Sequence, residues 1–206
     1  MASETKGGAT TSFDCQVVGV GGQGVVLASR LIAAAAMARG LFVRTAETIG
    51  MSQRGGSVAS HVRAAATADD LPSSLIPAHG ANLVLAFEPG EAVRAFGQLR
   101  ADGALVCATT PVVPSAAATN GYDGTAQLAW LADRLPRGHF SAVGTDALAR
   151  EGLSPKCLNV LLLGCAVGMG ALPFGPEELR GALRQLMKPR LVDMNERALD
   201  LGISLA

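Results

Sequence analysis

Two glycine-rich segments carry the residues of this sequence that could do chemistry. The first follows the apolar run from Cys15 to Val20 and consists of Gly19, Gly21, Gly22, Gln23 and Gly24 with Val20 among them. Gly19, Gly21 and Gly24 fit the G-x-G-x-x-G pattern of a strand-to-helix turn, where backbone N–H groups and a helix N-terminus can receive a phosphate or another anion. The same glycines would serve if the turn only had to let a helix pack closely on a sheet. Gln23 adds an amide at the tip, either to meet a ligand or to meet solvent.

The second segment places an arginine between glycines and consists of Ser52, Gln53, Arg54, Gly55 and Gly56, preceded by Gly50. A guanidinium offers a planar fork that suits a carboxylate or a phosphate. The glycines permit positive φ angles or a close backbone approach to a ligand. We expect Arg63, on the strand that follows, to add a second positive charge. The alternative is a surface loop with an ordinary arginine.

An acid after the first segment completes the textual fingerprint of a dinucleotide site. Glu47 lies roughly 20 residues beyond Gly24, where a dehydrogenase uses a carboxylate to hold a ribose hydroxyl. A stand-alone NAD(P)-binding Rossmann protein is therefore one alternative. No catalytic Tyr/Lys or His/Asp set supports it, the only tyrosine is Tyr122, and the arginine segment would have no role there. A scaffold protein whose glycines serve packing alone is another alternative.

The remaining titratable residues indicate no site by themselves. Glu88 and Glu91 are candidate acids without an evident partner, and the three histidines, His61, His79 and His139, have no metal-ligand spacing. No two of the four cysteines are spaced as C-x-x-C, so we expect no iron–sulfur cluster on this chain; they are Cys15, Cys107, Cys157 and Cys165.

Composition favours an aliphatic α/β domain that works in a complex. The 206 residues are 49% apolar and only 4% aromatic, and 17 basic residues balance 17 acidic ones, which argues against nucleic-acid or membrane partners. A net charge of zero gives little colloidal repulsion. We expect residues 1–12 to be a disordered tail without a secretory signal, residues 13–206 to be one domain, and the location to be cytoplasmic.

The apolar pattern predicts the elements that position the two segments. We expect a strand from Cys15 to Val20, a helix from Gly24 to Ala38 and a strand from Leu41 to Ala46, with the two strands parallel across the helical crossover. A strand over Ser57–Ala66 would have one wetter face. Further strands are expected over Ala81–Phe87, Ala104–Ala108 and His139–Val143, and helices over Pro89–Leu99, Thr125–Leu135, Asp146–Glu151, Pro155–Leu172, from Pro176, and over Leu191–Leu201. The fold class is a Rossmann-like three-layer α/β domain with a mostly parallel sheet and a helical C-terminal region.

Three motifs in this order resemble a known family. They are Val18-Gly-Val-Gly-Gly-Gln-Gly24, Gly50-Met-Ser-Gln-Arg-Gly-Gly56 and Asn159-Val-Leu-Leu-Leu-Gly164. The chain resembles the gamma subunit or domain of 2-oxoacid:ferredoxin oxidoreductases from about Asp14 to Gly202. The segment from Leu75-Ile-Pro77 through Leu85-Ala-Phe-Glu-Pro-Gly-Glu-Ala92 is most similar to the beta subunit of indolepyruvate:ferredoxin oxidoreductase, and the tail from Asp193 to Gly202 resembles the closing helix of that family.

This resemblance implies a division of labour between subunits. Such complexes decarboxylate a 2-oxoacid on thiamine diphosphate, pass electrons through [4Fe–4S] clusters to ferredoxin and transfer the acyl group to coenzyme A. Thiamine diphosphate and the clusters are then expected on a large partner subunit. The present chain would bind no cofactor alone, would have no catalytic residue of its own and would border the coenzyme A site, and in isolation it could form a homodimer. The family often has His where this sequence has Ile49, which puts the identity of the 2-oxoacid in doubt.

Overall fold

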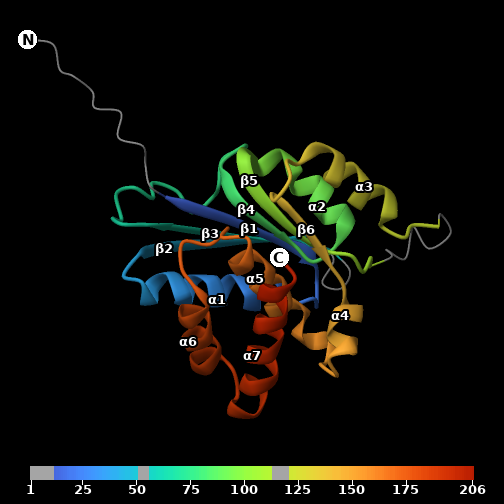
Figure 1. Ribbon diagram of the computed structural model, residues 1–206. Helices are drawn as coiled ribbons and strands as arrows, with labels where there is room; N and C mark the ends of the chain where they lie inside the picture. The colour runs from blue at the N-terminus through green and yellow to red at the C-terminus, as the bar shows by residue number, and fades with distance from the viewer. Residues whose placement is uncertain (1–11, 51–55, 113–120) are drawn as a thin grey trace, which may run out of the picture.

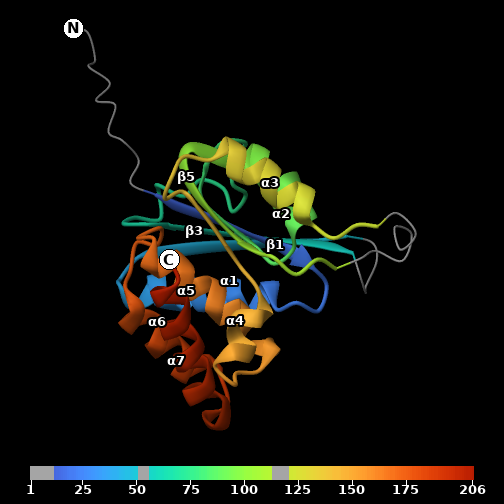
Figure 2. The same ribbon diagram turned by 45° about the vertical axis from the view of Figure 1, so that its right-hand side comes forward.

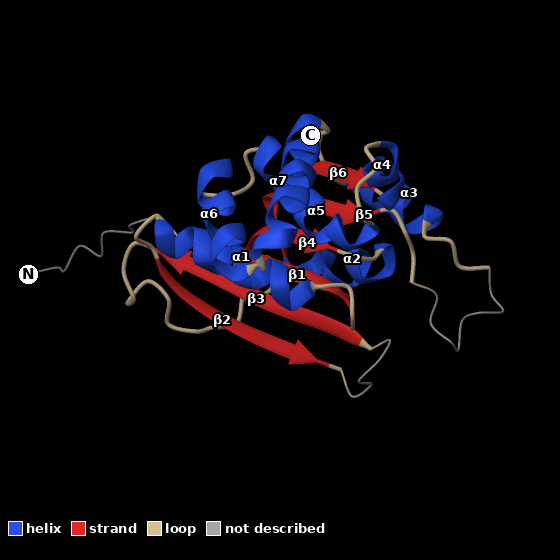
Figure 3. Cartoon of the chain, turned by 90° about the horizontal axis from the view of Figure 1, so that it is seen from below, coloured by secondary structure: helices blue, strands red, loops and turns tan. Residues whose placement is uncertain are grey.

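A six-stranded sheet forms the centre of the molecule. The computed structural model describes residues 12–50, 56–112 and 121–206. The strands lie in the order β2-β3-β1-β4-β5-β6, with β2 and β6 at opposite edges (Figure 3). Their bounds are β1 Phe13–Val20, β2 Phe42–Ile49, β3 Ser57–Ala65, β4 Ala81–Ala86, β5 Leu99–Ala108 and β6 Phe140–Val143.

Most of the sheet is parallel. β1, β4, β5 and β6 pair in parallel, whereas β3 is antiparallel to both β1 and β2. β1 and β2 therefore run in the same direction, as predicted, but they are not neighbours because β3 lies between them. The expectation of an adjacent β-α-β pair is wrong in that respect, since local apolar spacing says nothing about which strand fills the gap.

Helices cover both faces of this sheet, which confirms the predicted three-layer α/β fold. One face carries α2 (Pro89–Ala95) and α3 (Thr125–Arg134), and the other carries α1 (Val25–Ala38) and α5 (Leu158–Gly168) (Figures 1 and 2). The C-terminal region is helical, as predicted: α6 (Pro176–Leu186) contacts α1, and α7 (Pro189–Ser204) packs on α5. The short α4 (Thr145–Arg150) and the 3-10 turns η1 (Phe96–Gln98) and η3 (Pro155–Cys157) complete the described elements.

Glycines bring α5 and α7 into backbone contact. A Cβ atom at Gly164 would lie 2.3 Å from the carbonyl oxygen of Leu199, and one at Gly202 would lie 2.2 Å from that of Leu161. α5 is apolar apart from Asn159, as expected for a helix that is buried between the sheet and α7. Among the described residues, no helix has both the length and the apolar character needed to cross a bilayer.

A buried ion pair joins the amino end of β1 to the carboxyl end of β3. Asp14 and Arg63 stand opposite each other in the ladder, with Arg63 Nε 2.7 Å from Asp14 Oδ1 and Nη2 3.0 Å from Oδ2. Arg63 Nη1 also donates to the carbonyl oxygens of Ser73 and Leu75, so the pair fastens the loop between β3 and β4. The face that was expected to be wetter is thus covered. Arg63 lies roughly 20 Å along β3 from Gly56, and the prediction that it adds charge to the arginine segment is wrong.

His61, two residues before Arg63, is held in the same covered face. Its Nδ1 accepts a hydrogen bond from the Ile76 N–H at 3.3 Å. Burial, and then the nearby Arg63 charge, lower the pKa of His61 below its ordinary value. This is a structural histidine, as its lack of metal-ligand spacing indicates.

Some element boundaries differ from those predicted. β5 begins at Leu99 and passes through Asp102 and Gly103, with an irregular register between β4 and β5, instead of starting after a turn there. The helix expected to reach Leu172 ends at Gly168, and Gly170 has a φ of 67°. Residues 1–11 lie outside the described residues, so the tail and the domain boundary at residue 13 stay predictions.

Candidate functional site

The chain reverses its direction of travel across the sheet between β1 and β4. The connection after β1 leads to α1 on one face, and the connection after β4 leads to α2 on the other. Because these two connections leave neighbouring parallel strands towards opposite faces, the carboxyl ends of β1 and β4 form a topological switch point (Figure 1). Open α/β sheets bind their ligands at such a switch point. The first glycine segment lies there, directly after Val20.

The glycine turn adopts backbone angles that favour glycine. Gly22 has a φ of 99° and Gly24 a φ of 92°, both in the left-handed region. Among the described residues, no side chain caps the α1 N-terminus, and its first turn holds no acidic residue. The amino end of this 14-residue helix is therefore available to an anion.

Gln23 braces the turn from inside. Its Oε1 accepts from the Val20 N–H at 2.7 Å, and its Nε2 donates to the Phe87 carbonyl oxygen at 2.9 Å. The side chain therefore ties the β1–α1 turn to the end of β4. Gln23 is therefore not the purely solvated tip residue that was one of the two alternatives, and its contact with a ligand stays a prediction.

Two of the glycines serve close packing. A Cβ at Gly19 would lie 2.9 Å from Gln23 Oε1, from Phe87 Cβ and from Val25 Cγ2. A Cβ at Gly24 would lie 3.3 Å from Asn159 Nδ2, on the buried start of α5. The first and third sequence motifs thus meet in space.

The two glycine segments also meet. The Gly21 N–H donates to the Gly56 carbonyl oxygen at 3.0 Å, and the Gly50 N–H donates to the Ser57 carbonyl oxygen at 2.9 Å. Ser52, Gln53, Arg54 and Gly55 lie outside the described residues, so their role stays a prediction. Of this segment, the structure shows that the flanking Gly56 contacts the glycine turn.

Two carboxylates lie beside the glycine turn, at the carboxyl ends of the strands. Glu88 accepts from the Tyr122 hydroxyl and from the Glu91 N–H, and Glu91 accepts from the Ser57 hydroxyl and from Arg94. The view that these acids lack partners is wrong: Tyr122 and Ser57 come from other parts of the chain, and Arg94 lies three residues after Glu91 on α2. The acid-Pro-Gly-acid pattern at Glu88 was the available signal, since it is typical of a capped helix start.

The two carboxylates line a cavity of about 630 Å³ beside the glycine turn. Val20, Ser57, Glu88, Glu91 and Tyr122 are among its lining residues. Burial, and then the hydrogen bond to Glu88, raise the pKa of the Tyr122 hydroxyl far above its ordinary value. The hydroxyl is therefore a donor to Glu88 throughout the neutral pH range.

Strand order removes the dinucleotide alternative. Glu47 is exposed on the edge strand β2, opposite Ser60 of β3. The intervening β3 puts β2 about 10 Å from β1, whereas the dinucleotide fingerprint needs an acid on the strand adjacent to the glycine turn.

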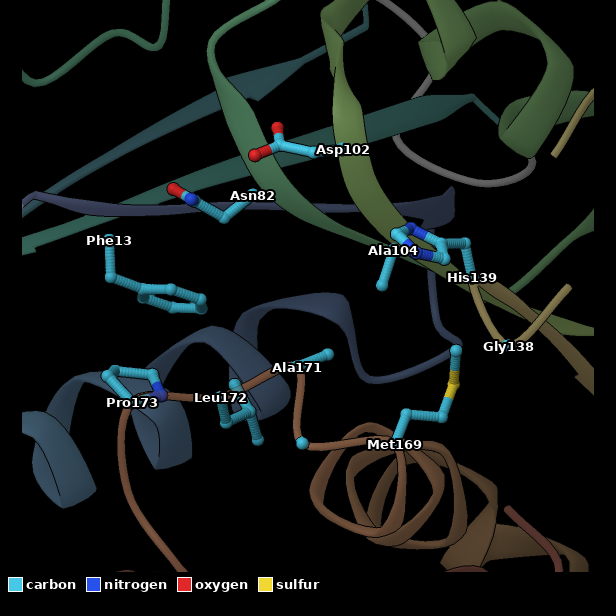
Figure 4. Close-up of a pocket in the computed structure, with 11 residues that line it drawn as sticks. Phe13, Asn82, Asp102, Ala104, Gly138, His139, Met169, Ala171, Leu172 and Pro173 are labelled. Atoms are coloured by element: carbon cyan, nitrogen blue, oxygen red, sulfur yellow. The ribbon is translucent and has the colours of Figure 1, made fainter. Parts of the chain in front are cut away.

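A second cavity, of about 370 Å³, lies at the other end of the strands, away from the switch point (Figure 4). Phe13, Asn82 and His139 line it near the amino ends of β1, β4 and β6. His139 Nδ1 lies 3.0 Å from the Gly103 carbonyl oxygen, and Asn82 Oδ1 accepts from the Asp14 N–H. These polar groups brace the strand ends, so the switch point remains the better candidate site.

Comparison with known proteins identifies the chain's family. The sequence pattern that defines the pyruvate ferredoxin/flavodoxin oxidoreductases matches residues 14–205. The chain belongs to this family. The matched residues span all three sequence motifs from which the resemblance was inferred.

Relatives of this oxidoreductase-family chain match it over nearly their whole length. The indolepyruvate oxidoreductase subunit IorB of Archaeoglobus fulgidus is 38% identical over 195 residues, which cover 92% of this chain and 93% of the relative. The IorB subunit of Pyrococcus horikoshii is 32% identical, over 94% of this chain and 96% of the relative.

Solved structures share the fold. A keto/oxoacid ferredoxin oxidoreductase gamma subunit from Geobacter sulfurreducens has a TM-score of 0.65 at 20% identity, covering 94% of this chain and 98% of that one. A 2-oxoglutarate:ferredoxin oxidoreductase from Magnetococcus marinus, with 2-oxoglutarate, coenzyme A and succinyl-CoA bound, has a TM-score of 0.66 at 20% identity. The match covers 95% of this chain and 31% of that longer one.

The cysteines of this family member are core residues. All four are buried, and they lie on β1, β5, η3 and α5. Burial raises the pKa of each thiol, that of Cys165 to about 11, which disfavours the thiolate that binds metals. Among the described residues, no three His, Cys, Asp or Glu side chains group as a metal site.

Proposed function

We propose that this chain is the small subunit of an indolepyruvate-type 2-oxoacid:ferredoxin oxidoreductase. The observation that carries the proposal is the full-length similarity to subunits named for indolepyruvate oxidoreductase. The substrates would be aryl pyruvates, and the products an acyl-CoA, carbon dioxide and reduced ferredoxin. The complex would work in the cytoplasm, and we do not expect nucleic acid or a membrane as a partner.

The cofactors of this reaction are assigned to a large partner subunit. Bound there, thiamine diphosphate would supply the decarboxylation chemistry and [4Fe–4S] clusters would carry the electrons to ferredoxin. The present chain does not fit a cluster, because its buried thiols lie on separate elements. No step of the chemistry is therefore placed on this chain.

The glycine turn would bind the anionic part of coenzyme A at the subunit boundary. The amino end of α1 favours negative charge, since no described side chain caps it, and a Cβ at Gly22 would meet no atom of the described residues within 4 Å. Arg54 would pair with the same phosphate or with a substrate carboxylate. The coenzyme A bound to the Magnetococcus marinus enzyme, whose fold includes this one, supports the choice of ligand.

We expect the isolated chain to have no oxidoreductase activity and to contain no iron. Co-expression with a thiamine-dependent, cluster-bearing subunit should give a complex that reduces ferredoxin only when an aryl pyruvate and coenzyme A are both present. Iron content and dye reduction, measured for the chain and for the complex, test this directly. Stoichiometric iron or turnover in the isolated chain would contradict the proposal.

The variants Arg54→Lys and Arg54→Ala should assemble normally, but their complexes should have a lower kcat or a higher KM for coenzyme A or oxoacid. Lysine cannot reproduce a two-pronged contact. Loss of a charge-assisted hydrogen bond at a desolvated site costs about 1.5–3 kcal/mol, or roughly a ten- to hundredfold effect on kcat or on KM for coenzyme A or oxoacid. Steady-state kinetics, with assembly checked by size-exclusion chromatography, measure it. Unaltered kinetics in both assembled variants would make Arg54 an ordinary surface residue.

A further inference from the structure

A chain of hydrogen bonds links three loops at the switch point. Gln23 Nε2 joins the glycine turn to Phe87 at the end of β4, and the Glu91 N–H bonds to Glu88 Oε2, which directly follows Phe87. From Glu91 the chain continues through Ser57 Oγ, 2.6 Å from Glu91 Oε2, to the start of β3. It closes where the Gly56 carbonyl oxygen receives the Gly21 N–H. The turn is therefore held from both sides.

Ser57 connects the side-chain part of this chain of hydrogen bonds to its backbone part. Ser57 and Val20 form the final pair of the β1–β3 ladder, and β3 begins at Ser57. The backbone on the amino side of Ser57 is therefore outside the paired strands. Its own carbonyl oxygen receives the Gly50 N–H, and the residue before it supplies the oxygen for Gly21. The side-chain bond to Glu91 is thus the contact from outside the ladder that fixes this corner among the described residues.

Glu91 is built to hold that position. Its side chain is buried, and its two oxygens are divided between Ser57 and the exposed Arg94. Glu88, which caps α2 by accepting from the Glu91 N–H, is itself held by the Tyr122 hydroxyl, and that hydroxyl also accepts from the Gly90 N–H at 2.9 Å. The carboxylate therefore sits on a helix start that is anchored at several points.

We propose that Glu91 is a positioning residue for the anion site: through Ser57 it fixes the Gly56 carbonyl oxygen that orients the Gly21 N–H and, with it, the glycine turn. This inference rests on the proposed function, because the anion is taken to be coenzyme A. Glu91 need not touch the ligand. Its loss would let the corner at Ser57 move, and small displacements of a binding group are costly.

The test uses the assembled complex with Ser57→Ala, Glu91→Ala and the double variant. Each single variant should raise KM for coenzyme A about three- to tenfold, with kcat within about twofold, since one hydrogen bond to a charged group is lost. The double variant should match the single ones, because both changes break the same contact. Ser57→Thr keeps the hydroxyl and should restore the wild-type KM. Ser204→Ala, at an exposed hydroxyl near the end of α7, is the matched control.

Amide hydrogen exchange in the full chain gives a readout that needs no activity. Exchange at Gly21 should accelerate in Ser57→Ala and Glu91→Ala but not in Ser57→Thr or Ser204→Ala. An unchanged coenzyme A KM in the variants of a coenzyme A-dependent complex would overturn the positioning role and leave the proposed function intact. A wild-type complex that turns over without coenzyme A would overturn the function instead. Even if the complex proves independent of coenzyme A, the exchange experiment still tests the structural part of the proposal. Unchanged exchange at Gly21 in Ser57→Ala and Glu91→Ala would show that Glu91 does not hold the glycine turn.

Discussion

Arg63→Met should destabilise the chain by about 3–5 kcal/mol, because it leaves the Asp14 carboxylate buried without its cation. Both side chains are less than a tenth exposed, and they share two hydrogen bonds. The loop between β3 and β4 would also lose the donor to the Ser73 and Leu75 carbonyl oxygens. Such a loss is a large part of the 5–15 kcal/mol that typical domains possess. The free energy of unfolding from urea titration measures it.

The double variant Asp14→Leu/Arg63→Met is the control for the charge effect. Removing both charges takes away the uncompensated carboxylate, so this variant should recover much of the lost stability. Recovery should be incomplete because the two loop carbonyls still lack their donor. A loss below about 1 kcal/mol in the single variant would mean that Asp14 finds water or another partner once Arg63 is gone.

Gly202→Ala should destabilise the crossing of α5 and α7 by about 1–3 kcal/mol or more, the usual range for overpacking. The new Cβ would lie 2.2 Å from the Leu161 carbonyl oxygen and 2.8 Å from Gly164 Cα. Both are backbone atoms, so no rotamer change relieves the clash and the helices must separate. Gly164→Ala meets the Leu199 carbonyl oxygen at 2.3 Å and should behave alike.

Gly181→Ala is a matched control within the same C-terminal region. Gly181 lies on α6 and is exposed, and no atom of the described residues would lie within 4 Å of a Cβ there. Because alanine is the better helix former by about 1 kcal/mol, this variant should be as stable as the wild type or more so. Thermal unfolding of the three variants separates helix propensity from packing. Equal melting temperatures for Gly202→Ala and Gly181→Ala would show that the crossing relaxes freely.

Local pattern determined much of the fold. An apolar run, a glycine turn and an alanine-rich helical stretch predicted β1 and α1 to within two residues at each end, and proline with acidic residues marked the start of α6. These signals are local because side-chain spacing, positive φ angles and missing N–H groups act over a few residues.

Local sequence patterns did not predict the order of the strands. The crossover between β1 and β2 predicted their common direction, yet β3 occupies the place between them, and this moves Glu47 away from the glycine turn. Sequence spacing constrains the direction of a strand through the length of its connection, but it does not determine which edge of the sheet the next strand joins.

The sequence by itself thus determined the fold class, the two glycine segments and the family. Only the tertiary structure decided what the polar residues do. Glu88 meets Tyr122 across 34 residues, Arg63 meets Asp14 across 49, and Gln23 reaches Phe87 across 64. A buried carboxylate, guanidinium or amide requires a hydrogen-bond partner, and this requirement can be predicted from the residue type. Which partner it finds depends on elements that only the packing of helices on the sheet brings together.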